Sequence, residues 1–190
     1  MTYFFLDTEW ADPLAKQLVS LALVSADGLY EFYAEMDPLP QTPTDFVRYV
    51  VYPLLDRGAT AMHSPDFTKA LRHFLSSVAE PYVLADHPND LALLQYAVAG
   101  FDLAEAQAQA CGPIPRPVYC RMLKDGITQL VLEDYFDAHP NAKQRRHHAL
   151  VDAQALRMAW LALTGRVAAP WSRALAMQNG VRSTPPLEAG

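Results

Sequence analysis

The sequence predicts one α/β or α+β domain in which helices pack on a central sheet. A buried apolar run opens the chain at residues 2–8, and two β-rich runs follow within residues 16–36. From residue 66 onward, helical patterns alternate with a further strand pattern. Strands that come first and then alternate with helices are typical of a sheet covered by helices. At 190 residues the chain is long enough to bury one core.

The strands are predicted from apolar runs and turn residues. Residues 2–8, TYFFLDT, read as a buried strand. The two runs within residues 16–36 meet at Asp27-Gly28, a pair that strongly favours a hairpin turn. A further short strand is expected at residues 81–85, PYVLA.

A helix is expected over residues 44–56, after the proline-broken loop 37–43. Thr44-Asp45 is a helix start signal, and Pro53 interrupts the final turn. The spacing predicts a packed apolar face made of Phe46, Tyr49, Val50 and Leu54.

Further helices are expected at residues 66–78, 89–101, 102–112 and 148–165. The last is the clearest, because Ala149, Leu156 and Trp160 follow its period and Gly165 ends it. Residues 117–127 and 137–146 follow no clear pattern. The functional domain is therefore assigned to residues 1–165. Residues 166–190 are expected to form a tail, helical over 171–178 and disordered over 182–190.

Composition limits the function classes. No basic leader and no membrane-length apolar run is visible, which predicts a cytoplasmic protein with no membrane partner. Cys111 and Cys120 fit a reducing compartment better than a disulfide. The net charge of −6 argues against broad binding to duplex DNA, but it allows a local groove for a few nucleotides. The basic run 143–146 is either a solvated loop or a phosphate-binding segment.

Two acids in the first strand point to metal chemistry. Asp7 and Glu9 are two residues apart, so their side chains share one face of the strand while Thr8 faces the other. Two clustered carboxylates without a cation repel each other or force one to protonate. A pair of divalent ions some 3.5–4 Å apart would neutralise them. The alternative is an exposed strand end with solvated acids.

Other acids are needed to complete such a site. Asp90 opens the helix that follows the strand at 81–85, a common place for active-site groups, although it also suits a helix cap. Asp86 is the rival candidate. Asp152 lies one turn inside the last long helix, and His147 lies just before that helix. A histidine so placed can take a proton from an attacking water, and the alternative is a surface histidine.

In this order the residues resemble the DEDDh family of 3′–5′ exonucleases. FLDTEW is similar to the first motif of that family, YVLADHPNDLALL to the second and HHALVDA to the third. The second motif departs from the family pattern, with Ala85-Asp86 and Asn89 where His-Asn and Phe are usual. The early motif, the hairpin and the following DFVRYVVYPLLD look most like the bacterial branch of polyadenylate-specific ribonuclease AS.

The resemblance implies a ribonuclease H-like α/β fold with a mixed central sheet flanked by helices. It implies two Mg²⁺ or Mn²⁺ ions as cofactors, with ligands at Asp7, Glu9, Asp90 and Asp152. It assigns the general base to His147 rather than His148.

The resemblance also implies the substrate and the partners. The expected activity is 3′–5′ hydrolysis of single-stranded RNA ends by a homodimer. Thr8, Trp10, Arg145 and Arg146 are the expected substrate contacts, and a core position is the alternative for Trp10. The rival functions are a DNA exonuclease of the same family, an inactive nucleic-acid-binding protein, and an unrelated α/β protein.

Overall fold

The computed structural model describes residues 1–116, 118–123 and 126–182, and within these residues it contains one mixed sheet of six strands. The strands are β1 (Thr2–Trp10), β2 (Leu18–Ser25), β3 (Glu31–Met36), β4 (Ala61–Met62), β5 (Pro81–Ala85) and β6 (Tyr119–Met122). Their order is β4-β3-β2-β1-β5-β6. The β1–β2 and β2–β3 pairs are antiparallel, and the other pairs are parallel.

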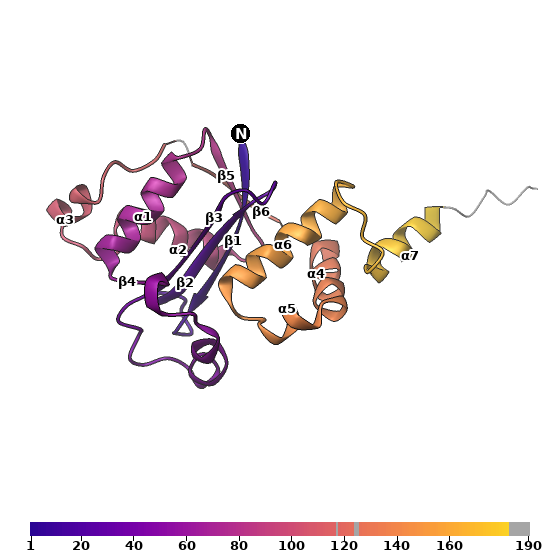
Figure 1. Cartoon of the computed structure of the whole chain (residues 1–190), viewed down its shortest axis with the longest axis horizontal. Coiled ribbons are helices and arrows are strands. Elements are labelled where there is room, and N and C mark those ends of the chain that lie inside the picture. Colours follow the sequence, from indigo (N-terminus) through magenta and orange to yellow (C-terminus); the bar gives the residue numbers. More distant parts are fainter. Residues whose placement is uncertain (117, 124–125, 183–190) are drawn as a thin grey trace, which may run out of the picture.

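Helices cover both faces of this sheet. They are α1 (Ser64–Ser76), α2 (Pro88–Ala99), α3 (Glu105–Ala110), α4 (Gly126–Ala138), α5 (Pro140–Gln144), α6 (Ala149–Leu163) and α7 (Arg173–Arg182). Figure 1 shows α1, α2 and α3 on one side of the sheet and α4, α5 and α6 on the other. The α/β fold with a mixed sheet flanked by helices is confirmed, and it is consistent with a ribonuclease H-like arrangement. Among the described residues, no helix combines the length and the apolar character that crossing a membrane requires.

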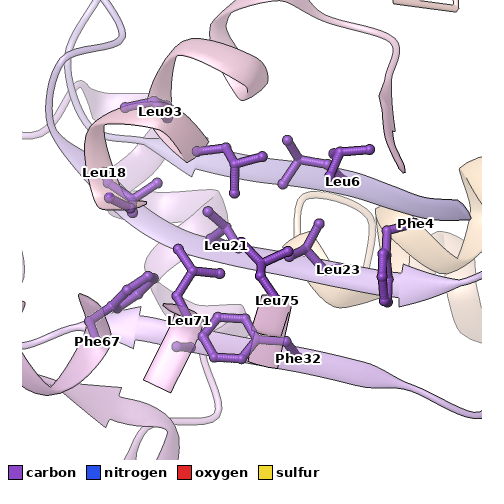
Figure 2. Close-up of a cluster of buried hydrophobic side chains, with 14 of the residues drawn as sticks. Phe4, Leu6, Leu18, Leu21, Leu23, Phe32, Phe67, Leu71, Leu75 and Leu93 are labelled. Atoms are coloured by element: carbon purple, nitrogen blue, oxygen red, sulfur yellow. The ribbon is translucent and has the colours of Figure 1, made fainter. Parts of the chain in front are cut away.

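The main core lies between the sheet and the α1–α2 layer (Figure 2). Alternate residues of β1, Phe4 and Leu6, point into it, as the two-residue period of a strand requires. Helix α1 supplies Phe67, Leu71 and Leu75, all fully buried. Thr8 continues this alternation and shares the core-facing side of β1 with Phe4 and Leu6. Asp7 and Glu9 therefore lie on the opposite side of the strand.

Small side chains let α6 lie close to the other face of the sheet. Ala149 and Ala153 of α6 pack against Ala22 and Val24 of β2, and all four are buried. Further along the helix, Leu156 packs on Phe5 and Leu84. The beginning of α6 therefore lies beside the residues of β1 that follow Phe5, where the acids stand.

Helix α4 is the main element missing from the sequence-based prediction. It packs on α6 and α7 through a cluster that includes Val131, Phe136 and Ala159. The segment 117–127 supplies β6, and the segment 137–146 supplies α5. The expected helix over 102–112 is wrong in extent, because α3 covers only Glu105–Ala110.

The tail is anchored to the domain where the structure describes it. The Asp134 carboxylate on α4 accepts hydrogen bonds from the Ser172 hydroxyl, the Arg173 guanidinium and the Ala174 N–H. These bonds hold the start of α7, which matches the helix expected over 171–178. Of the residues expected to be disordered, 183–190 lie outside the described residues. Both cysteines are free, Cys111 buried and Cys120 exposed.

The segment 44–56 is helical, but its predicted apolar face is wrong. It forms a π-helical turn, η1 (Val47–Val51), followed by a 3₁₀ turn, η2 (Tyr52–Leu54). The buried residues are Val47 and Val51, which pack with Ala11 and Val19. A π-helical turn has more residues per turn than the α-helical period assumed, so a different stripe faces the core. The stripe predicted to be buried is largely exposed.

Candidate metal centre

A cleft of about 400 Å³ opens at the C-terminal end of β1. Three parts of the chain meet there: β1, the segment that leads from β5 into α2, and the loop before α6. Its lining also includes Thr44, Phe46 and Val47, at the start of η1. The residues that carry its chemistry are Asp7, Glu9, Asp86, Asp90, His147 and Asp152. The fold thus brings together every residue that the sequence assigns to catalysis or metal binding, and it adds Asp86.

The six residues form two groups. One oxygen each of Asp7, Asp86 and Asp90 lies within 4.8 Å of the others. In the second group, the Glu9 and Asp152 carboxylates and a His147 ring nitrogen satisfy the same limit. Asp7 and Glu9 stand on one face of β1, as predicted, and each begins one group. Each group is compact enough for its members to share one cation.

Thr8 faces the opposite side of β1 and orients Asp90. Its hydroxyl donates a hydrogen bond of 2.7 Å to Asp90 Oδ1, and both side chains are buried. Asp90 lies in the first turn of α2, where the helix dipole also favours a carboxylate. The Thr8 hydroxyl, expected to contact substrate, is therefore engaged with a candidate ligand. Thr8 lines the cleft, and its hydroxyl holds the Asp90 carboxylate.

Asp86 and Asp90 are not alternatives, because the structure places both near Asp7. Asp86 follows β5 directly and accepts a hydrogen bond of 2.9 Å from the Gln129 side chain on α4. Asp90 comes one helical turn later. The short connection between β5 and α2 turns both carboxylates toward the same end of β1.

The loop before α6 places His147 beside Asp152. His147 has a φ of 73°, a left-handed conformation that is costly for a residue with a side chain. In this conformation its N–H donates a hydrogen bond of 3.0 Å to Asp152 Oδ2. Its ring packs edge-on against Phe46, with centroids 4.9 Å apart. Unusual backbone geometry that persists at a cleft is a feature of functional sites.

His148 has a different environment. It is 1% exposed, and its ring lies 4.6 Å from that of Tyr33 under the start of α6. Its Nε2 is 3.4 Å from Asp56 Oδ2, an ion-pair distance without hydrogen-bond geometry. Burial is the main cause that lowers the pKa of His148. This histidine belongs to neither acidic group, and its buried ring contributes to the packing of the fold.

Three buried carboxylate oxygens in the cleft have no hydrogen-bond partner within the described ranges. They are Asp7 Oδ2, Asp90 Oδ2 and Asp152 Oδ1. A buried charge without a partner is costly, and proteins normally pair it or bind a cation to it. Carboxylate oxygens are the donors that suit Mg²⁺ or Mn²⁺. The residues present therefore fit a divalent metal centre.

The pKa values of the four acids are also those expected of buried carboxylates that lack a cation. Burial, followed by repulsion from neighbouring acids, raises the pKa values of Asp7 and Glu9 well above their ordinary range. Burial also raises the pKa values of Asp90 and Asp152 to about 7. Without a cation, the site is therefore incompletely ionised at neutral pH. A bound cation would lower these pKa values by favouring the charged forms.

The basic side chains expected to contact substrate are paired with acids. The Arg145 guanidinium lies 2.8 Å from Asp56 Oδ1. Arg146 makes a two-pronged ion pair with Glu133 and lies 4.9 Å above the Phe136 ring. Lys143 pairs with Asp137. The run 143–146 is thus largely neutralised by neighbouring segments, and a substrate phosphate would have to compete with these acids.

Trp10 lies between the core and the cleft. It is partly buried against the main core, and it also lines the cleft. Its ring lies 5.3 Å from that of His87, at an angle of 31°. The side chain is thus held in place on one side while it contributes to the cleft wall.

No protein-family model matches this chain, and no curated protein is similar enough in sequence to count as a match. A function for this chain is therefore inferred from its residues and their geometry.

The raised carboxyl pKa values predict that the metal-free protein loses stability between about pH 4 and pH 7. In this window the folded acids retain protons that the unfolded acids, with pKa values near 4, have released. Stability therefore falls as pH rises through the window. The lowered pKa values of His147 and His148 act in the opposite direction, but only below about pH 6.5.

Urea unfolding in EDTA at pH 5 and at pH 7.5 measures this effect. We expect a loss on the order of several kcal/mol at the higher pH, since each pKa unit corresponds to about 1.4 kcal/mol per group. Saturating Mn²⁺ at pH 7.5 should restore stability, because the ion binds only the folded site. Equal stability at both pH values, together with no response to Mn²⁺, would contradict the metal centre.

Proposed function

We propose that this protein is a metal-dependent 3′–5′ exoribonuclease of the DEDDh type, acting on single-stranded RNA ends. The observation that carries the proposal is the set of three unpartnered carboxylate oxygens, from Asp7, Asp90 and Asp152, in one cleft with His147 at its edge. Their order along the chain and their motifs resemble that family. In an acidic cluster that binds no cation, the buried oxygens would instead be paired with hydrogen-bond donors.

Each residue has a distinct part in the proposed hydrolysis. Asp7, Glu9, Asp90 and Asp152 would hold two divalent ions, with Asp86 beside Asp7. Such ions supply charge stabilisation for the attacking and leaving oxygens of an in-line displacement. Thr8 keeps the Asp90 carboxylate in orientation through its 2.7 Å hydrogen bond. The His147 N–H holds Asp152 in the same way.

His147 is the proposed general base. Burial, with a smaller effect of Arg146, lowers its pKa, so the ring is neutral and able to accept a proton at pH 7. The ring takes a proton from water as the water oxygen bonds to phosphorus. The bond between phosphorus and the 3′ oxygen of the preceding nucleotide breaks, and that oxygen gains a proton. The products are a nucleoside 5′-monophosphate and a strand shorter by one nucleotide.

A gel assay with 5′-labelled single strands tests this function. RNA and DNA of the same sequence are each incubated with Mg²⁺, with Mn²⁺ and with EDTA. We expect a ladder that shortens from the 3′ end of RNA only when metal is present. Preferential cleavage of DNA would reassign the substrate, and metal binding without cleavage of either strand would favour a nucleic-acid-binding protein.

A further inference from the structure

An exposed apolar stripe lies on the η1 turn beside the cleft. Phe46, Tyr49 and Val50 are 49%, 73% and 37% exposed. Phe46 and Val50 are four residues apart, close to the period of a π-helical turn, so they lie on one side of it, and Tyr49 directly precedes Val50. Val47 and Val51 hold the opposite side against Ala11 and Val19. Single exposed apolar residues are ordinary, but these three lie within five residues of one another and the first of them lines the cleft.

This stripe is continuous with the candidate metal centre. Phe46 lines the cleft, and its ring meets the His147 ring edge-on. Tyr49, with the largest exposed fraction of the three, lies one turn further along. A strand whose end reaches the carboxylates and which extends outward over η1 would meet Phe46 in the cleft wall and then Tyr49 outside it.

Arg48 gives the same turn a positive charge, which lies beside Pro40 and Tyr52 next to the cleft-lining segment. It is exposed, and it forms no ion pair with any residue in the described ranges. Arg145 and Arg146, by contrast, are paired with Asp56 and Glu133. Aromatic rings next to an unpaired cation are the combination that binds single-stranded nucleic acids, through base stacking and phosphate contact.

We infer that Phe46 and Tyr49 stack on unpaired bases near the 3′ end of the substrate strand, while Arg48 contacts its backbone. This inference rests on the proposed function and names the part of the substrate that the site holds. Stacking tolerates any base and contributes about 1–3 kcal/mol per base. Paired bases cannot offer their faces to a side chain, so the stripe selects single-stranded ends.

A second copy of the chain is a poorer fit to the stripe. An aromatic side chain has about 150–250 Å² of surface, so the exposed fractions of the three residues together amount to about 300 Å². A stable interface of standard size buries about 800 Å² on each partner. The stripe alone therefore matches a few nucleotide bases better than a protein surface.

Tyr49→Ala is the discriminating variant, since its exposed side chain contributes little to folding. We expect its KM for single-stranded RNA to rise about 5- to 150-fold, the equivalent of 1–3 kcal/mol, with kcat nearly unchanged. Tyr49→Phe should retain the wild-type KM. Tyr30→Ala, which removes an exposed tyrosine from the β2–β3 turn, is the matched control. Hydrolysis of bis(p-nitrophenyl) phosphate, which has no base, should be unaffected in all variants.

Two further measurements separate this inference from the proposed function. Fluorescence anisotropy with labelled RNA, in Ca²⁺ instead of Mg²⁺, reports binding without turnover. Sedimentation velocity of the wild type and Tyr49→Ala reports the oligomeric state. RNA binding that depends on Tyr49 in a protein that cleaves nothing would support the stripe and reject the proposed activity.

The remaining outcomes would overturn the inference. If the wild type cleaves RNA and Tyr49→Ala has unchanged KM and Kd, the stripe is not a base platform although the activity stands. If a wild-type dimer dissociates in Tyr49→Ala, the stripe belongs to a second copy of the chain. If the wild type neither binds nor cleaves RNA, the inference and the proposed function both fail.

Discussion

Replacing Asp7 with alanine is expected to abolish the proposed nuclease activity and, at the same time, to stabilise the metal-free protein. Asp7 has an unpartnered buried oxygen, and burial together with Asp90, Asp152, Glu9 and Asp86 raises its pKa. Removing it relieves this repulsion, which should add on the order of 1 kcal/mol to the free energy of unfolding at pH 7. Activity should fall at least about a thousandfold, the equivalent of about 4 kcal/mol in the activation barrier.

Asp12→Ala is the matched control, because Asp12 lines the same cleft but has a different environment. Its partial burial opposes ionisation, but hydrogen bonds from the N–H groups of Gln17, Lys16 and Leu14 outweigh this and lower its pKa. Its loss should therefore destabilise the protein. Urea unfolding in EDTA and the oligonucleotide assay measure both variants. An Asp7→Ala protein that is less stable than the wild type would make Asp7 a structural residue instead of a ligand.

The two adjacent histidines are expected to respond in opposite ways to substitution. His147→Ala should lower kcat by about 10²–10⁴-fold, the usual contribution of a general base, with a small effect on stability. His148→Ala should mainly destabilise the fold, by about 2–4 kcal/mol, because it removes a fully buried ring packed on Tyr33. Where His148→Ala remains folded, its kcat should stay within about tenfold of the wild type.

Rate measurements at a temperature where both variants are folded, with urea unfolding in parallel, separate the two effects. The kcat of the wild type should also fall at acid pH as His147 becomes protonated, with an apparent pKa below the ordinary histidine value. A larger loss of kcat in His148→Ala than in His147→Ala would reverse the assignment of the base.

The sequence predicted the elements whose patterns are local. The hairpin at Asp27-Gly28, the strand Pro81–Ala85 and the helix that begins near Ala149 are confirmed. These elements are predicted by a turn-forming residue pair, a short apolar run and a sustained helical spacing of apolar residues. None of these patterns depends on residues that are distant in the sequence. Helix α4 was missed, although Val131, Leu132, Tyr135 and Phe136 recur at helical spacing and give a usable signal.

The candidate site was less predictable because it depends on contacts between distant segments. Sequence spacing placed Asp7 and Glu9 on one face of β1, and this is confirmed. It could not decide between Asp86 and Asp90, because that depends on how the connection between β5 and α2 turns. Nor could it show that Glu133 and Asp56 pair with the arginines before α6. The apolar face predicted for residues 44–56 was wrong, because a π-helical turn has more residues per turn than the α-helix that was assumed.

The acids of the cleft come from both layers that enclose the sheet. Asp90 belongs to α2, which packs in the core on one face, while Asp152 belongs to α6, which packs on the other. Asp7 and Glu9 stand on the strand between them. An ion in the first group would join α2 to β1, and an ion in the second would join α6 to the same strand, so the two ions together would link the two layers across the end of the sheet. Metal binding would then make the opening of either layer depend on the other, so that the unfolding of α2 and α6 becomes one cooperative event.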